Sequence, residues 1–380
     1  MHLRKRKAAA TAAATVAATV SRTGKRAKVD VKNEVEVSSA LTSSRAQKLT
    51  QDVSYAQVME AIKPQVKLEP EPEANLDSPR VKVEAEVEGE EEEQDLPPNI
   101  FSKVDPADAA TGPSNWSTIY NEVVEMRSKF MAPVDHQGCE SMPNTITPNL
   151  QKTNPQKYRF QLLISLMLSS QTKDEVNYDA MSKLNTALSQ LYPEFGFSLQ
   201  SVSKLTPGEI DSYISKVGFH NRKSNYIHQA CQILIQEHKG DIPRTIEEIV
   251  KLPGVGPKMG YLLLQCGWGI NSGIGVDVHL HRLASMWGWI SRKANTPEKC
   301  RAELESWLPS RYWTDINPLV VGFGQVVCVP RAPNCDICSL GRTGVCKSAN
   351  KKLVNSTISD ERRAKLMKQR ADLTNLINEL

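Results

Sequence analysis

Apolar residues recur three and four positions apart along most of the chain after residue 114, which is the spacing of one face of an α-helix. Short connections that contain Gly or Pro separate these stretches, and none of them alternates in the manner of a strand. The pattern predicts an all-α protein in which about six antiparallel helices between residues 152 and 281 form one compact unit. The predicted helices are 116–130, 158–170, 176–191, 207–217, 223–237, 242–252 and 259–266.

The turn between the last two of these helices reads LPGVGPK, from Leu252 to Lys258. Gly254 and Gly256 permit positive φ angles and the close approach of a ligand, and Pro257 suits the first turn of the following helix. Two helices joined in this way form a helix-hairpin-helix. The amides of Gly254, Val255 and Gly256, with the positive end of the second helix behind them, suit a phosphate and carry no information about base sequence.

Lys258 follows this turn directly and has two possible roles. An ordinary lysine has a pKa near 10.4, so a free amine at pH 7 costs roughly 4.6 kcal/mol. A helix N-terminus supplies only about 0.3 to 1 kcal/mol of this, so desolvation in a pocket must supply more. Lys258 is then either a nucleophilic amine or a lysine that contacts DNA phosphate.

Four of the eight cysteines fall within nineteen residues, with the spacing Cys328-x6-Cys335-x2-Cys338-x7-Cys346. Inside a cell such thiols stay reduced, which favours a metal site over disulfides. The spacing by itself allows either zinc or an iron–sulfur cluster.

Taken together, four motifs resemble the endonuclease III family, and its eukaryotic homologues in particular. They are LMLSSQTKD at 166–174, LPGVGPK at 252–258, VDVHLHR with Asp277, and the clustered cysteines, and they occur in the family's order between residues 114 and 348. The resemblance implies a helix-hairpin-helix DNA glycosylase fold. It places a six-helix domain at 152–281 and a discontinuous iron–sulfur cluster domain at 113–151 and 282–349, with a C-terminal helical extension at 350–380.

The resemblance also implies catalytic roles. Lys258 attacks the sugar, and Asp277 handles protons and stabilises the positive charge that develops as the base leaves; the residues alone make Asp277 an ordinary N-cap. His279 helps to shape the damage pocket or is a core histidine. The gap from Lys258 to Asp277 is one residue longer than in the bacterial pattern, which places detailed loop contacts in question.

Further roles concern DNA and the cofactor. Gln171 would enter the duplex and fill the gap left by an extruded nucleotide, while Lys173 and Arg331 would approach phosphate. The four cysteines would hold a [4Fe–4S] cluster, although the last gap has seven residues here and five in the family. Without the family, Gln171 is simply a polar residue at a helix end.

The implied function is that of a bifunctional DNA glycosylase and AP lyase of base excision repair. It would excise oxidised pyrimidines from damaged double-stranded DNA through a Lys258 Schiff base and cut 3′ to the site by β-elimination, acting as a monomer. Two alternatives compete. Adenine-mismatch glycosylases share most motifs but generally lack the lysine and add a C-terminal domain, and a non-enzymatic DNA-binding scaffold would not need Lys258.

Residues 1–112 are predicted to be a disordered targeting and regulatory tail, with Ala-Thr repeats, charge blocks and few aromatic residues. Basic clusters before Asp30 suit a mitochondrial transit peptide, a nuclear localisation signal or both. Hydrophobic-Lys-x-acid patterns suggest SUMO attachment at Lys32, Lys67 and Lys82, and 84–95 is strongly acidic.

The charge balance differs between the two parts of the chain. Residues 1–100 carry 15 Lys plus Arg against 17 Asp plus Glu, whereas residues 101–380 carry 32 against 26, and this basic excess fits a nucleic-acid partner. No membrane span is expected.

Overall fold

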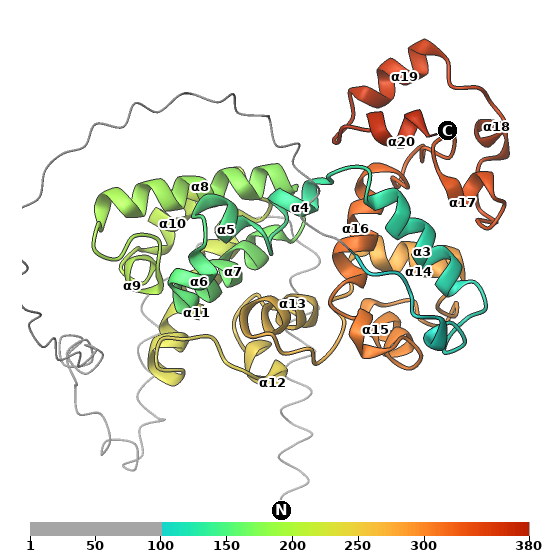
Figure 1. The fold of residues 1–380 in the computed structure, drawn as a ribbon. Coiled ribbons are helices and arrows are strands. Elements are labelled where there is room, and N and C mark those ends of the chain that lie inside the picture. The colour runs from blue at the N-terminus through green and yellow to red at the C-terminus, as the bar shows by residue number, and fades with distance from the viewer. Residues whose placement is uncertain (1–100, 380) are drawn as a thin grey trace, which may run out of the picture. The chain divides into compact units, whose positions relative to one another are not determined.

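The structure of the chain is a computed structural model that describes residues 101–379 (Figure 1). Every regular element in this part of the chain is a helix, so the prediction of an all-α protein is confirmed. Among these helices none combines the length and the apolar character needed to cross a membrane. The proposed transit peptide, the SUMO patterns and the acidic segment 84–95 lie outside the described residues.

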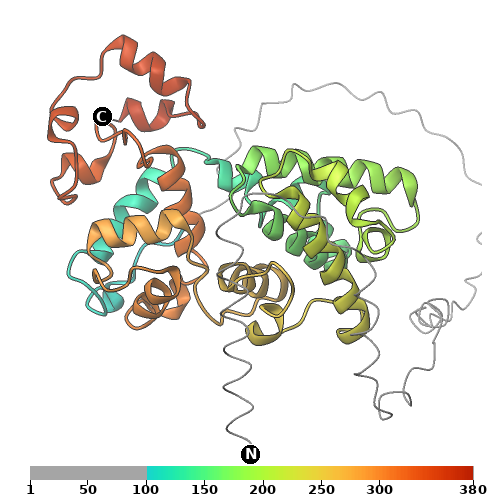
Figure 2. The same ribbon diagram turned by 180° about the vertical axis from the view of Figure 1, so that it is seen from behind.

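The first of two hydrophobic cores, here named the bundle core, is built from residues 142–264. Its centre is α7, where Leu162, Leu163 and Leu166 are completely buried. This helix is buried on nearly every side over Tyr158–Leu168 and lies among the other helices of the bundle in Figures 1 and 2, as expected for a helix at the centre of a core. The helices around this core are α5 Met142–Ile146, α6 Leu150–Thr153, α7 Pro155–Ser169, α8 Asp174–Leu191, α9 Leu199–Val202, α10 Pro207–Ile214, α11 His220–Glu237, α12 Ile246–Ile249 and α13 Pro257–Trp268.

The second core, here named the cysteine-side core, combines residues 101–132 with 274–377. Trp116, Tyr120 and Tyr312 pack there at ring-centroid distances of 5.5–6.2 Å. The helices and 3-10 turns that contribute to it or border it are η3 Pro106–Asp108, α3 Trp116–Arg127, α4 Pro133–Gln137, α14 Val278–Trp287, α15 Pro297–Glu305, η4 Ser310–Tyr312, α16 Ile316–Val326, α17 Ser339–Arg342, α18 Lys351–Val354, α19 Asp360–Met367 and α20 Thr374–Asn378.

Two predicted boundaries differ from the structure. Packed structure begins before Ser114, because Phe101 and Val104 are buried in the cysteine-side core. The predicted helix 242–252 shrinks to α12, Ile246–Ile249. The side chain of Thr245 caps that helix by accepting a hydrogen bond from the backbone N–H of Glu248, so the helix cannot start earlier.

The chain after residue 358 packs back onto the cysteine-side core. Leu366, Leu373 and Ile377 are buried, so their apolar stripe faces protein. The predicted C-terminal helix is divided into α19 and α20. Arg370, which lies between them, pairs with Glu175 at the start of α8 at 2.6 Å and thus links the extension to the bundle.

Candidate active site

The predicted hairpin lies between α12 and α13. Gly254 has a φ of +78°, and a side chain there would collide with the ring of Tyr226. Gly256, in contrast, is extended at φ −100°, so the positive φ that glycine permits is not used at this position. Nothing lies within 4 Å of where its Cβ would be, which leaves the hairpin accessible there. Pro257 occupies the first position of α13 as predicted.

Lys258 and Asp277 stand at the starts of two different helices. Lys258 is the second residue of α13 and is half-buried. Asp277 is 8% exposed and caps α14, because its Oδ1 accepts a hydrogen bond from the backbone N–H of Leu280 at 2.7 Å. The cap that the sequence suggested is therefore present, and it holds the carboxyl group in a fixed orientation.

His279, on the first turn of α14, lies within electrostatic range of both Lys258 and Asp277. Burial lowers the pKa of His279; the nearby carboxylate of Asp277 opposes this shift, and the cations of Arg282 and Lys258 reinforce it. The Nδ1 atom of His279 is buried and has no hydrogen-bond partner in the described part of the chain. It packs against Gly324, where a Cβ would lie 2.7 Å from Nδ1.

Two carboxylates that we did not assign from sequence belong to the same cluster. Burial raises the pKa of the Glu140 carboxyl, with the positive charge of Lys258 opposing this and the negative charge of Asp277 adding to it. Burial likewise raises the pKa of Asp174, against a hydrogen bond from Gln325 at 2.7 Å. Local spacing does not give either residue this role, because their partners Lys258, Asp277 and Gln325 lie more than 80 positions away.

The tip of the bundle next to the hairpin carries Gln171. This residue is exposed and adopts a left-handed φ of +51°, with the exposed Lys173 two positions on. The neighbouring loop presents Phe219, which is 58% exposed at φ +58° and was not singled out from the sequence. Together with Gly254 of the hairpin, Gln171 and Phe219 line a cavity of about 240 Å³. Its exposure and its left-handed backbone are visible only in the structure, which is why the sequence did not identify Phe219.

The four clustered cysteines line one small cavity behind α14 and α16. Burial raises the pKa of the Cys338 thiol to about 12, and Cys335 is also buried. In the described residues, no three His, Cys, Asp or Glu side chains are grouped as a metal site. The donor set nevertheless fits an iron–sulfur cluster, because all four cysteines line the same, mainly apolar cavity.

Arg282 joins the cysteine cavity to the helix that Asp277 caps. Its Nη2 donates to the carbonyl oxygen of Cys328 at 2.6 Å, and its Nη1 lies 3.8 Å from the sulfur of the same residue. Arg331 is exposed in the loop between Cys328 and Cys335, where it can reach a ligand in solvent.

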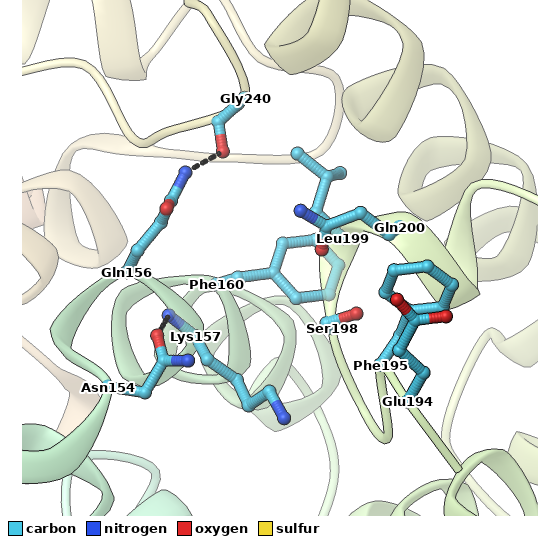
Figure 3. Close-up of a pocket in the computed structure, with 10 residues that line it drawn as sticks. All are labelled: Asn154, Gln156, Lys157, Phe160, Glu194, Phe195, Ser198, Leu199, Gln200 and Gly240. Carbon is cyan, nitrogen blue, oxygen red and sulfur yellow. Dashed lines mark hydrogen bonds between the residues drawn. The ribbon is translucent and has the colours of Figure 1, made fainter. Parts of the chain in front are cut away.

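A second pocket, of about 170 Å³, lies at the start of α7 (Figure 3). Gln156 closes one side by donating to the carbonyl oxygen of Gly240 at 2.8 Å. None of its residues is a predicted site residue, so this pocket is separate from the charge cluster. It is lined by Asn154, Gln156, Lys157, Phe160, Glu194, Phe195, Ser198, Leu199, Gln200 and Gly240.

Comparison with known proteins decides the family. Residues 164–310 match the HhH-GPD superfamily of base excision DNA repair proteins. The endonuclease III homolog of Schizosaccharomyces pombe is 43% identical over 262 residues, which cover 69% of this chain and 70% of that protein. The chain belongs to the endonuclease III homologues. It is therefore an enzyme of base excision repair, a DNA glycosylase with AP lyase activity that binds DNA.

The chain is also similar to further endonuclease III proteins. Endonuclease III homolog 2 of Saccharomyces cerevisiae is 42% identical over 251 residues, covering 64% of this chain and 66% of that protein. A solved structure titled as a non-covalent endonuclease III–DNA complex matches with 25% identity and a TM-score of 0.46, covering 57% of this chain and 96% of that one.

Proposed function

We propose that Lys258 is the nucleophile of a bifunctional reaction on oxidised pyrimidines in double-stranded DNA. The observation that carries this is that Lys258 at the start of α13 and Asp277 at the cap of α14 both lie near enough to the half-buried His279 to shift its pKa. The Lys258 amine forms a bond to C1′ of the extruded nucleotide as the bond from C1′ to the base breaks. The resulting amine–sugar adduct opens to a Schiff base.

Strand cleavage follows from the same intermediate. Loss of a proton from C2′ of the Schiff base expels the 3′ phosphate, which is a β-elimination, and hydrolysis then releases Lys258. Asp277 stabilises the positive charge that develops on the sugar when the base departs, since its cap contact with Leu280 orients the carboxylate beforehand. His279 borders the damaged base.

DNA contacts position the sugar against this amine. The hairpin amides of Gly254 and Gly256 bind phosphate at the start of α13, whereas the N–H of Val255, which we also expected there, donates to the carbonyl oxygen of Leu252 at 3.1 Å. Gln171 enters the duplex in place of the extruded nucleotide, because a base within the stack cannot be reached. Lys173 and Arg331, both exposed, bind backbone phosphate.

Cys328, Cys335, Cys338 and Cys346 would hold a [4Fe–4S] cluster, and the mainly apolar cavity that they line together supports this. When bound, the cluster would crosslink residues 328–346 through the four thiolates. The two hydrophobic cores support a division into a six-helix domain and a cluster domain near the predicted boundaries. The enzyme would act as a monomer in the nucleus, the mitochondrion or both, and SUMO attachment at the three tail lysines stays a prediction.

Borohydride trapping on duplex DNA that contains an oxidised thymine tests the nucleophile. The wild-type chain should form a covalent adduct, and Lys258→Ala should form none. Lys251→Ala is the matched control, because Lys251 is an exposed lysine of the same hairpin. No adduct with wild-type protein would reject the Schiff base, and an adduct retained by Lys258→Ala would place the nucleophile elsewhere. Activity only on adenine mismatches would favour the adenine-mismatch alternative.

A further inference from the structure

Lys223 of α11 is a buried lysine whose contacts surround Gln171. Its side chain is in the protein interior, and the residue is 5% exposed. The Nζ atom donates to the carbonyl oxygen of Leu168 at 2.7 Å, to that of Ser170 at 2.6 Å and to the hydroxyl of Thr172 at 3.2 Å. These acceptors belong to the last turn of α7 and to both neighbours of Gln171.

All three acceptors are neutral, and an ammonium group has three hydrogens to donate. The last carbonyls of α7 lack helical partners and carry the negative end of the helix dipole, so a cation suits them. Burial of the ammonium nevertheless costs free energy, and it lowers the pKa of Lys223 to about 8. A buried ammonium group without a carboxylate partner adds little to the stability of the fold, so stability alone does not explain Lys223.

The segment that Lys223 holds is strained. Gln171 is a non-glycine residue at φ +51°, a conformation that persists only where its surroundings enforce it. Gly218 provides the opposite wall, since a Cβ there would lie 2.5 Å from the carbonyl oxygen of Gln171. The N–H of Gly218 also donates to the hydroxyl of Thr172 at 3.2 Å. Lys223 and Gly218 therefore fix the backbone on either side of Gln171 and leave its side chain in solvent.

We propose that Lys223 is a positioning residue for strand insertion: it fixes the backbone of residues 170–172 so that the Gln171 side chain is presented to the duplex before DNA binds. Preorganisation of this kind lowers the entropy lost when Gln171 enters the gap. The inference rests on the proposed role of Gln171 and extends it to a buried residue whose hydrogen bonds go to the protein backbone and to Thr172.

A double-mutant cycle tests this with a duplex that carries a tetrahydrofuran abasic analogue, compared with the same duplex undamaged. Lys223→Met and Gln171→Ala should each weaken binding of the abasic duplex on the order of tenfold and leave the undamaged duplex unchanged. The double variant should be no weaker than Gln171→Ala, because both changes remove one interaction. Lys216→Met, an exposed lysine before the same loop, is the matched control.

The outcomes separate the two ideas. If Gln171→Ala weakens abasic binding while Lys223→Met does not, or if the two losses simply add, Lys223 has no positioning role. If Gln171→Ala binds the abasic duplex as tightly as the wild type does, the insertion role of Gln171 is rejected, and the positioning role of Lys223 is rejected with it. Thr172→Val is a second variant for the case in which Lys223→Met does not fold. It removes one of the three acceptors of Lys223 and should weaken binding of the abasic duplex about threefold.

Discussion

Replacing Arg362 by alanine would remove the main polar contact between the C-terminal extension and the cysteine loop, residues 328–346. Arg362 holds Asp336 with two hydrogen bonds of 2.7 and 2.8 Å, and its Nη2 also donates to Asn334 at 2.9 Å. The side chain of Asp336 is 1% exposed and that of Arg362 is 22% exposed. Asp336 follows Cys335 directly, so the pair fixes the backbone between two proposed cluster ligands.

The expected loss of stability follows from the carboxylate left behind. Breaking a buried ion pair by removing one partner costs about 3–5 kcal/mol, because the remaining charge is buried without compensation. Arg362 is partly exposed and water can enter after its removal, so we expect about 2–3 kcal/mol for Arg362→Ala. In a folded part of this length, such a loss lowers the melting temperature by roughly 5 °C.

Thermal unfolding followed by circular dichroism measures this change. Arg363→Ala is the matched control, since Arg363 is the adjacent exposed arginine and makes one contact, to Asn378 at 3.1 Å. We expect the Arg363 variant to melt within about 1 °C of wild type. Equal melting temperatures for Arg362→Ala and Arg363→Ala would refute the view that the extension stabilises the cysteine loop through Asp336.

Three further predictions concern the site. Asp277→Asn should keep the cap on Leu280 and the melting temperature of the wild type, whereas Asp277→Ala should lose about 1 kcal/mol of stability. Both variants should lose base excision activity, and an active Asp277→Asn would contradict the need for a carboxylate. The purified chain should show the visible absorption of an iron–sulfur cluster, and Cys338→Ser should lose it; colourless zinc-loaded wild type would be the opposite result. Preference for abasic over undamaged duplex should fall as pH rises through about 8, because Lys223 then loses a proton and a hydrogen bond to the Gln171 loop, and should stay flat in Lys223→Met. The pKa of Lys223 is lower in the folded state than its unfolded value of 10.5, so the contribution of Lys223 to the free energy of unfolding rises with pH between the two values. Its hydrogen bonding to residues 170–172 weakens over the same range, so thermal unfolding and DNA binding should change in opposite directions.

The sequence predicted most helices of this protein, because apolar spacing and prolines at helix starts are signals carried by residues a few positions apart. The spacing of apolar residues gave α3 and α13 nearly to their ends, and Pro257 marked the start of α13. The same signal failed at α12, where the cap at Thr245 outweighs the apolar pattern before it. Gly254 and Gly256 looked equivalent in the sequence, yet only Gly254 has positive φ.

The motifs of the sequence by itself determined the family and pointed to Lys258 and Asp277, because hairpin, cap and cysteine spacing each occupy a few consecutive residues. Only the tertiary structure showed that Glu140 lies near Lys258 and that the buried Lys223 donates hydrogen bonds to the residues on either side of Gln171. It also decided that the C-terminal stripe faces the protein. These facts depend on contacts between residues far apart in the sequence, such as Ser170 with Lys223 and Glu140 with Lys258. Burial, which shifts the pKa of these groups, exists only once the helices have packed.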